Sequence, residues 1–364
     1  MAGQSAPWAV IGMGMGGKGV AAELGVMGYR LRVHDIIEDE VRDIGVNGGL
    51  KVQGRDRDFA PVEMASTDLA EAVQGAQVII VCTWGTEHAR VARDLAPLLV
   101  DGQLILLIQG NAGGALVVRN ELKRAGCAAE VDVAQFDGYP YMMTVLAPDS
   151  VLLTTNKEEL LMAALPATRN DAVMAVIGDA FPMARPAPDI LHLAFDKGGI
   201  LHVPAMVTNV GFVESDREYH HYTDGMTPSV IRLVQALDAE RVAVALAYGI
   251  PEAPVEDWLF QTYGVREESL YETIQAIALT HYKYCPRPQS LEYRFLSQDL
   301  GCISVTTAAL GDVAGVDTPI TDSVITMAGA LTGVDYWKTG RNLENLGLAG
   351  KSVSEIQTAV SVGV

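Results

Sequence analysis

The first half of the chain alternates short apolar runs with longer segments in which apolar residues recur at helical spacing. The apolar runs are AVIG (9–12), YRLRVHD (29–35), QVIIVCT (77–83) and QLILLIQ (103–109), with a further strand expected at 131–134. They are rich in Val, Ile and Leu, which is typical of parallel strands covered on both faces. The helical segments are 18–28, 86–99 and 114–126. This alternation predicts an α/β domain with a doubly wound, Rossmann-like parallel sheet.

A cluster of prolines indicates where this first domain ends. The mixed segment 142–165 is expected to add strands at the far edge of the sheet. The three prolines of FPMARPAPD (181–189) then interrupt the pattern. We therefore place a domain boundary after residue 185.

The remainder of the chain has the pattern of an all-α domain. Thr227 can cap a helix with Pro228 in its first turn, and Gly249 stands where a C-terminal glycine belongs. Apolar residues recur at helical spacing between them. Further helices are expected near 266–281 and 319–331. The predicted domains are 1–185 and 186–364.

Composition and charge narrow the class of protein. The 364 residues carry a formal net charge of −19, which argues against nucleic-acid partners and anionic membrane surfaces, because both require a basic face. The apolar runs are too short to cross a bilayer, and the N-terminus has no signal-peptide pattern. The four cysteines form no CxxC pair and are expected to be reduced thiols. These features favour a cytoplasmic protein with small-molecule partners, and an apolar helical face in the second domain would allow a homodimer.

A glycine loop follows the first predicted strand and opens the first predicted helix. It reads Gly12-x-Gly14-x-x-Gly17. In such loops the first glycine permits a tight turn, the second lets the backbone approach a pyrophosphate, and the third lets helix and strand pack closely. The alternative is a glycine-rich turn without a ligand, but the strand, the helix and a following acidic residue all match the context of a dinucleotide-binding motif.

Three polar residues at strand ends are candidates for cofactor binding. Asp35 ends the second strand, where a carboxylate accepts hydrogen bonds from ribose hydroxyls and repels a 2′-phosphate, so NAD is favoured over NADP. Asp35 could instead cap a helix that starts near Glu38. Thr83 and Asn111 follow later strands and are expected to reach the nicotinamide side, although ordinary loop residues would look the same.

His202 is a single titratable residue in the apolar run GGILHVPAMVTN. On a helix it shares a face with Met206 and Asn209, and Pro204 would bend the helix between them. A histidine at such a kink is a candidate general acid/base, with Asn209 a candidate for substrate binding. A core histidine held by a neighbour fits the same residues.

Three other histidines carry weaker signals. His220 and His221 are adjacent and would point different ways on a helix or strand, so no metal site is expected. His88 is expected on a solvated helix face.

Four separated blocks resemble the opine dehydrogenase (octopine/nopaline dehydrogenase) family. They are GGILHVPAMVTN, YHHYTDGMTPSVIRLVQALDAERVAVA, YRFLSQDLGCISV and GRNLENLGLAG, in that order. The resemblance covers nearly the whole chain. It implies an NAD-dependent enzyme that couples an amino acid or amine to a 2-oxo acid such as pyruvate by hydride transfer to an imine.

The resemblance also implies roles for three residues. The family's proton-transfer dyad, a histidine closely followed by proline and an aspartate in an Arg-Tyr/Phe-x-x-Glu-Asp segment, corresponds to His202 and Asp299. The family's arginine that binds a substrate carboxylate corresponds to Arg294. A carboxylate that orients a histidine and a guanidinium that grips a carboxylate are consistent with this chemistry. Judged alone, Asp299 could be a loop cap and Arg294 a surface ion-pair residue.

The chain departs from the family after the strand near 131–134. The family's Glu-Thr pair, which helps to bind the amino donor, is replaced by Gln135 and Phe136. Asp137 could supply the carboxylate two residues further on, so Gln135 and Asp137 are substrate-binding candidates. The segment before Asp299 also lacks the family's Glu. The hydride chemistry survives these changes, whereas the identity of the amine stays open.

Two other functions remain compatible with these residues. A dehydrogenase of a 2-hydroxy acid, or of another C–O substrate without an amine, would use the same three residues. A non-catalytic NAD(H) sensor would keep the glycine loop and Asp35 but would not need a His202–Asp299 pair.

Overall fold

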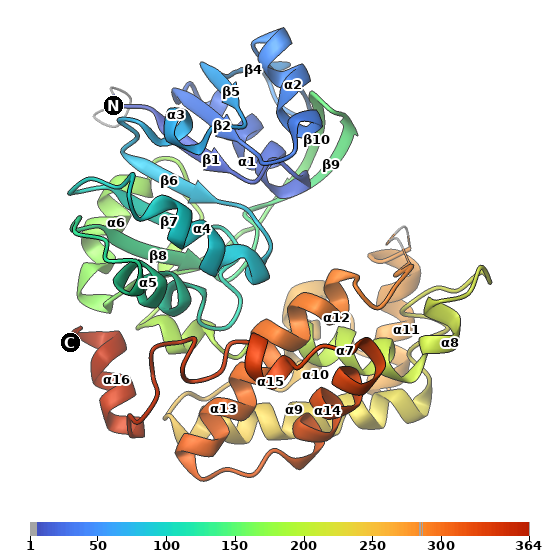
Figure 1. Ribbon diagram of the computed structural model, residues 1–364. Helices are drawn as coiled ribbons and strands as arrows, with labels where there is room; N and C mark the ends of the chain where they lie inside the picture. Colours follow the sequence, from blue (N-terminus) through green and yellow to red (C-terminus); the bar gives the residue numbers. More distant parts are fainter. Residues whose placement is uncertain (1–5, 284, 286, 364) are drawn as a thin grey trace. The chain divides into compact units, whose positions relative to one another are not determined.

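The computed structural model describes residues 6–283, 285 and 287–363 and divides the chain into two compact units (Figure 1). The first, here called the α/β unit, runs to Leu193 and also contains the C-terminal residues from Thr358. The second, here called the helical unit, comprises Ala194–Gln357.

The α/β unit is built on an eight-stranded sheet with the order β12-β11-β8-β7-β6-β1-β2-β5. All neighbours from β8 to β5 are parallel, whereas β11 runs antiparallel to β8. The central strands are buried along their whole length, as expected for a sheet with helices on both faces. The predicted doubly wound parallel sheet is therefore confirmed. Its strands are β1 (Trp8–Ile11), β2 (Leu31–His34), β5 (Met64–Ser66), β6 (Val78–Val81), β7 (Leu104–Leu107), β8 (Asp132–Phe136), β11 (Leu160–Leu165) and β12 (Ala184–Pro186).

A second, four-stranded sheet has the order β4-β3-β10-β9 and was not predicted. Its strands are β3 (Gly49–Gln53), β4 (Phe59–Pro61), β9 (Tyr141–Ala147) and β10 (Ser150–Asn156). The segment 142–165 was expected at the edge of the large sheet, but only β11 pairs there. Helix α1 (Met15–Val26) contacts both sheets, as Figure 1 illustrates. Gly19 and Gly25 allow this approach, because a Cβ at either position would lie under 3 Å from Met143 or Ala60.

The proline cluster does not interrupt the sheet. Pro186 ends β12, an edge strand, where a missing backbone N–H is tolerated. The prediction placed the division after residue 185, and the structure places it after Leu193, with the chain end returning to pack Gly363 beside Pro166. The other helices of this unit are α2 (Glu38–Asn47), α3 (Leu69–Val73), η1 (Gly85–Glu87), α4 (His88–Leu95), α5 (Gly114–Arg124), η2 (Ala167–Arg169), α6 (Asn170–Ile177) and η3 (Ile190–Leu193).

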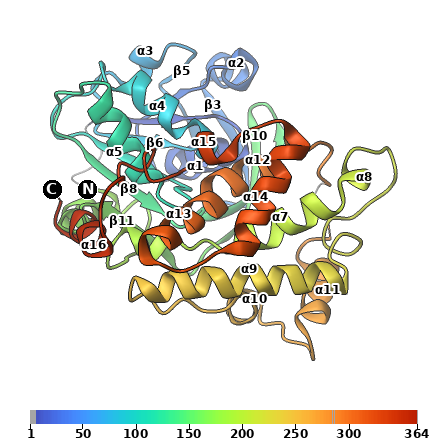
Figure 2. The same cartoon turned by 60° about the horizontal axis from the view of Figure 1, so that its bottom comes forward.

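The helical unit is organised around α9 (Pro228–Ala247), the long helix seen in Figure 2. Thr227 caps α9 by accepting a hydrogen bond from Val230 N, and Pro228 occupies its first turn, as predicted. Helices α7 (Gly198–Thr208), α13 (Val305–Ala314) and α14 (Pro319–Thr332) pack against α9. The remaining elements are α8 (Val210–Val213), α10 (Val255–Tyr263), α11 (Leu270–Thr280), α12 (Arg294–Asp299), the π-helical turn η4 (Leu300–Ser304) and α15 (Tyr336–Thr339), while α16 (Val353–Ser361) spans the division between the units.

Over the residues described, no helix combines the length and the apolar character that crossing a membrane requires.

Candidate active site

The glycine loop between β1 and α1 is shaped by close backbone contacts. Gly12 has a φ of +89°, and a Cβ there would lie 2.8 Å from Thr83 Cγ2. A Cβ on Gly17 would lie 1.8 Å from the Gly12 carbonyl oxygen. Gly14 differs, because no atom lies within 4 Å of the position its Cβ would take. Packing therefore requires a glycine at the first and third positions. At Gly14 the space is open, and there the protein backbone is expected to approach the pyrophosphate of a ligand.

Asp35 follows β2 and holds the glycine loop in place. Its Oδ2 accepts a hydrogen bond from Met13 N at 2.6 Å, and its Oδ1 accepts one from Ile37 N at 2.9 Å. The N-cap of α2 is Ile37 rather than Asp35, so the alternative reading of Asp35 as a helix cap is not borne out. Each carboxylate oxygen has a second lone pair that can accept a hydroxyl group.

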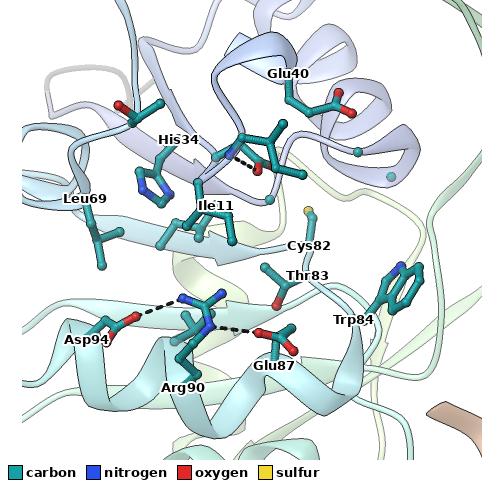
Figure 3. Close-up of a pocket in the computed structure, with 18 of the residues that line it drawn as sticks. Ile11, His34, Glu40, Leu69, Cys82, Thr83, Trp84, Glu87, Arg90 and Asp94 are labelled. Carbon is teal, nitrogen blue, oxygen red and sulfur yellow. Dashed lines mark hydrogen bonds and ion pairs between the residues drawn. The ribbon is translucent and has the colours of Figure 1, made fainter. Parts of the chain in front are cut away.

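A pocket of about 910 Å³ opens beside this loop. Its walls include Gly12, Gly14, Asp35 and Thr83, so the glycine loop and the ends of β2 and β6 all contribute. Figure 3 shows Arg90 of α4 in this pocket, paired with Glu87 and Asp94. The volume lies within the usual range for a cofactor pocket.

Thr83 and Asn111 present buried polar atoms at the carboxyl ends of β6 and β7. Within the described part of the chain, Thr83 Oγ1 and both amide atoms of Asn111 have no hydrogen-bond partner. Asn111 also has a φ of +51°, an uncommon conformation for a residue other than glycine. Leaving such groups buried and unsatisfied costs about 1–3 kcal/mol each. Partners supplied by a bound nicotinamide nucleotide would remove this cost, so these residues fit the cofactor that the motif implies.

Gln135 and Asp137 occupy different surroundings. Gln135 is fully buried in β8, where its Oε1 accepts from Ala115 N and its Nε2 donates to Asn111 O, both at 2.9 Å. This geometry makes Gln135 a support for the Asn111 loop and does not favour the substrate contact expected from the sequence. Asp137 is exposed just beyond β8 and pairs through its backbone with Gln109.

His88, expected on a solvated face, is fully buried at the start of α4. That expectation was wrong because α5 covers this face of α4: a Cβ on Gly114 would lie 3.0 Å from His88 Nδ1.

In the helical unit, His202 and Asp299 meet although 97 positions separate them. His202 Nδ1 lies 2.6 Å from Asp299 Oδ2, and the imidazole stacks on Phe295 with ring centroids 3.8 Å apart. Its second nitrogen, Nε2, lies 2.9 Å from the hydroxyl of Tyr222. Both members of the dyad are largely buried, so their interaction is weakly screened by solvent.

Two local features place the dyad. His202 lies in the middle of α7, two residues before the internal Pro204. Asp299 is the last residue of α12 and is followed at once by the π-helical turn η4. Short π-helical insertions are rare and occur frequently at functional sites. The backbone therefore changes from α-helix to π-helix directly after Asp299, the residue whose carboxylate contacts His202.

Arg294 begins α12, five positions before Asp299. Its guanidinium lies 4.9 Å from the centroid of Phe295, the ring on which His202 stacks. The side chain is half-buried, and within the described residues it forms no ion pair with a carboxylate. A half-buried cation without an anionic partner, close to a His–Asp pair, suits the binding of a substrate carboxylate.

Asn209 ends α7, and its amide is used to hold the backbone. Its Nδ2 donates to Ala205 O at 2.9 Å and to Gly225 O at 3.1 Å. Asn209 therefore ties α7 to the loop before α9, and these bonds do not favour its use as a substrate ligand.

Two neighbours of the dyad were not predicted as site residues. Tyr222 lies in one of the four blocks that carry the family resemblance, but no spacing in the sequence points to its contact with His202. His221 is buried beside them, with 1% of its surface exposed, and neither ring nitrogen has a partner within the described residues. Burial lowers the pKa of His221 well below its ordinary value, so this ring is neutral. His220 instead bonds Thr223 N and Tyr282 O, so the two adjacent rings face different surroundings.

A dinucleotide-type glycine loop lies on a parallel sheet, and the same chain carries an all-helical unit with a His–Asp dyad. Beside the dyad is an arginine that forms no ion pair within the described residues. Together these features define a nicotinamide-nucleotide-dependent oxidoreductase.

Comparison with known proteins identifies the family. Residues 186–332 match the family described as NAD/NADP octopine/nopaline dehydrogenase, alpha-helical domain. The chain is 30% identical over 359 residues to an opine dehydrogenase from Arthrobacter sp. (strain 1C), covering 98% of this chain and 99% of that one. The chain belongs to the octopine/nopaline dehydrogenase family. It is therefore a nicotinamide-nucleotide-dependent oxidoreductase of the opine dehydrogenase type, which acts on CH–NH bonds. Family membership favours the enzyme over the sensor.

Solved structures agree in fold over the whole length. A structure of octopine dehydrogenase in complex with NADH and agmatine has a TM-score of 0.77 at 19% identity, covering 98% of both chains. Apo yersinopine dehydrogenase has a TM-score of 0.77 at 16% identity, covering 99% of this chain and 98% of that one. The predicted family and fold class are confirmed.

Proposed function

We propose that this enzyme couples a small 2-oxo acid to an amino acid with a cationic side chain, or to a related cationic amine, with His202, Asp299 and Arg294 as its reactive groups. The observation that carries this proposal is the bond between His202 Nδ1 and Asp299 Oδ2, formed near Arg294, which has no carboxylate partner among the residues described. In this proposal the helical unit supplies the dyad and the carboxylate clamp, and the α/β unit binds the cofactor and supplies Asp137 for the amine.

His202 is the proposed proton donor and acceptor. Asp299 accepts from Nδ1–H, which fixes the tautomer and stabilises the imidazolium form, so that Nε2 is left to exchange a proton. Bound NADH supplies hydride for the carbon of the imine. Stacking on Phe295 holds the imidazole plane, and a fixed orientation favours proton transfer along one direction.

Arg294 is the proposed clamp for the carboxylate of the oxo acid. A guanidinium can donate two parallel hydrogen bonds to a carboxylate, which fixes both the position and the plane of the bound acid. The Arg294 guanidinium and the His202 imidazole both contact the ring of Phe295, so one aromatic side chain positions both groups.

The cofactor is proposed to bind along Gly12, Gly14 and Gly17, with its adenosine ribose on Asp35. Asp35 lies in the wall of the pocket, and its negative charge would oppose a 2′-phosphate, which favours NAD over NADP. Thr83 and Asn111 are proposed to face the nicotinamide, because their buried polar atoms have no hydrogen-bond partner within the described residues.

The amine is proposed to be cationic because the exposed carboxylate of Asp137 follows β8. Solved complexes of octopine dehydrogenase contain agmatine and L-arginine, which are both cationic, and another contains pyruvate. A carboxylate at Asp137 would suit donors of that kind.

The test is NADH oxidation at 340 nm with pyruvate and related 2-oxo acids, with and without a panel of amino acids and amines, and with NADPH in parallel. Turnover that needs both substrates, and that prefers arginine or agmatine over neutral amines, is the expected result. Turnover with the oxo acid alone would instead favour a 2-hydroxy acid dehydrogenase. Asp137→Asn provides the matched variant, and a preference for cationic donors that survives this change would rule out Asp137 as their partner.

Two properties of the whole protein stay predictions. None of the four cysteines is joined in a disulfide, which suits the reducing cytoplasm. A homodimer through an apolar helical face is consistent with partly exposed Met327, Leu331 and Trp337, and light scattering on the purified protein would test it.

A further inference from the structure

Every hydrogen-bonding position on the His202 ring is filled by a side chain. Asp299 takes Nδ1 at 2.6 Å, and the hydroxyl of Tyr222 takes Nε2 at 2.9 Å. An imidazole nitrogen offers one hydrogen-bonding direction in the ring plane. A substrate oxygen therefore cannot bond directly to Nε2 while the Tyr222 hydroxyl stays in place.

Tyr222 is built into the packing of the helical unit. Only 4% of its surface is exposed, and its ring stacks on Tyr282 with centroids 4.3 Å apart. The Tyr222 carbonyl oxygen accepts a hydrogen bond from Gln275 Nε2 of α11 at 3.2 Å. These contacts favour a fixed hydroxyl over one that swings away when substrate binds.

A phenol hydroxyl can accept one proton while it donates another, so it can stand between a histidine and a reacting oxygen. We propose that Tyr222 carries the proton between His202 Nε2 and the oxygen atom that the substrate loses. This inference rests on the proposed function above and adds to it the group that would touch the substrate.

The proton balance can be written for the coupling direction. Addition of the amine to the oxo carbon gives a carbinolamine, and His202 begins as an imidazolium. The C–O bond breaks, the Tyr222 O–H proton passes to the departing hydroxyl to form water, and the nitrogen lone pair forms the C=N bond. The Nε2 proton of His202 passes to the Tyr222 oxygen. His202 ends neutral, the substrate ends as an iminium ion, and Asp299 stays ionised throughout.

The surroundings keep Tyr222 protonated and able to donate. Burial raises the pKa of Tyr222 well above its ordinary value, and the nearby Arg294 opposes that rise. The titratable and charged groups that face Tyr222 from the packed elements are His202, Asp299, Arg294, His220, His221, Tyr263, Tyr282 and Cys285.

The test is Tyr222→Phe in the full-length enzyme, with Tyr282→Phe as the matched control. Each substitution removes one hydroxyl oxygen from one of two stacked rings, but only Tyr222 bonds His202. For Tyr222→Phe we expect kcat to fall about 100-fold or more, with little change in the KM of the oxo acid and in NADH affinity. For Tyr282→Phe we expect kcat to stay within about threefold of the wild-type value.

Position 222 also allows a rescue experiment. Site-specific 3-fluorotyrosine restores the hydroxyl and makes it more acidic, so it should recover most of the lost kcat and shift the pH profile of kcat. This variant also tests the proposal if Tyr222→Phe fails to fold, because an unchanged pH profile would then contradict a proton transfer through this hydroxyl.

The remaining outcomes separate the two proposals. Tyr222→Phe with wild-type kcat, or with a lower KM for the oxo acid, would mean that substrate displaces the hydroxyl and that Tyr222 carries no proton. If His202→Asn were inactive in the same assays, the proposed function would still stand. If His202→Asn were also fully active, the roles assigned to the dyad would be wrong as well.

Discussion

At the scale of single residues, the site depends on buried polar groups, and the role of each group follows from its hydrogen-bond partner. Asp299 is 3% exposed, and its short contact with His202 is the interaction that distinguishes a catalytic pair from two core residues. His221 lies beside this pair as a neutral ring without partners within the described residues. The two groups therefore predict different effects, one on catalysis and one on stability.

Asp299→Asn should lower kcat on the order of 10³-fold, because an amide does not stabilise the imidazolium and can hold the wrong tautomer. The KM of the oxo acid should change little, because Arg294 is retained. Steady-state kinetics would check this, with Asp257→Asn, a half-exposed aspartate of α10 paired with Arg266, as the control. Equal activity of both variants would be incompatible with the dyad.

His221 should make the folded protein less stable in mild acid. Its pKa is lowered in the folded state, so below pH 6.5 the unfolded chain binds a proton that the native chain does not, and the free energy of unfolding falls as the pH falls. The slope from this one group approaches about 1.4 kcal/mol per pH unit. Urea unfolding between pH 5 and pH 7 should show a shallower dependence for His221→Asn, and parallel curves would contradict the assignment.

At the scale of elements, short connections hold the site more than the helices and strands themselves do. The glycine loop is held by the hydrogen bond from Met13 N to Asp35, and Thr83 lies so close to Gly12 that a Cβ there would not fit. The loop after β7 is fixed by Gln135 from the neighbouring strand. The turn η4 serves the same purpose for Asp299, since it interrupts an otherwise continuous helical segment.

Two of the motif glycines, Gly14 and Gly17, should respond differently to alanine. Gly14→Ala should leave the melting temperature unchanged and weaken NADH binding by about tenfold or more, because its Cβ would meet only the ligand. Gly17→Ala should destabilise the α/β unit itself, because its Cβ would overlap the Gly12 carbonyl. Thermal melting and NADH fluorescence titration measure both quantities, and a Gly14→Ala protein that binds NADH normally would argue against this position for the pyrophosphate.

At the scale of the whole molecule, the two units carry separate parts of the chemistry. The pocket with the glycine loop is formed entirely by the α/β unit, and the His202–Asp299 pair entirely by the helical unit. Cofactor binding and proton transfer should therefore be separable by mutation and by ligand.

NADH alone should protect the α/β unit from hydrogen exchange, most strongly in peptides that contain the glycine loop and the end of β6. A ligand at 100 times its Kd stabilises the unit that binds it by about 2.7 kcal/mol. Exchange measured by mass spectrometry on the wild-type protein, with and without NADH, provides the check, and Gly14→Ala is the control. If protection were confined to Ala194–Gln357, the assignment of the cofactor to the α/β unit would be wrong.

The sequence by itself determined what is local. Buried strands, the spacing of three glycines, and the Thr227 cap of α9 all follow from short-range patterns, because backbone geometry and burial repeat with the period of each element. Resemblance to the opine dehydrogenases added His202, Asp299 and Arg294. The tertiary structure decided the features that depend on distant segments. Strands β9 and β10 belong to the second sheet, and the Gln135 side chain bonds the Asn111 loop. Helix α5 covers His88, and Tyr222 bonds His202. Such contacts join residues that lie far apart in the chain, and no local period records which buried polar group will find which partner.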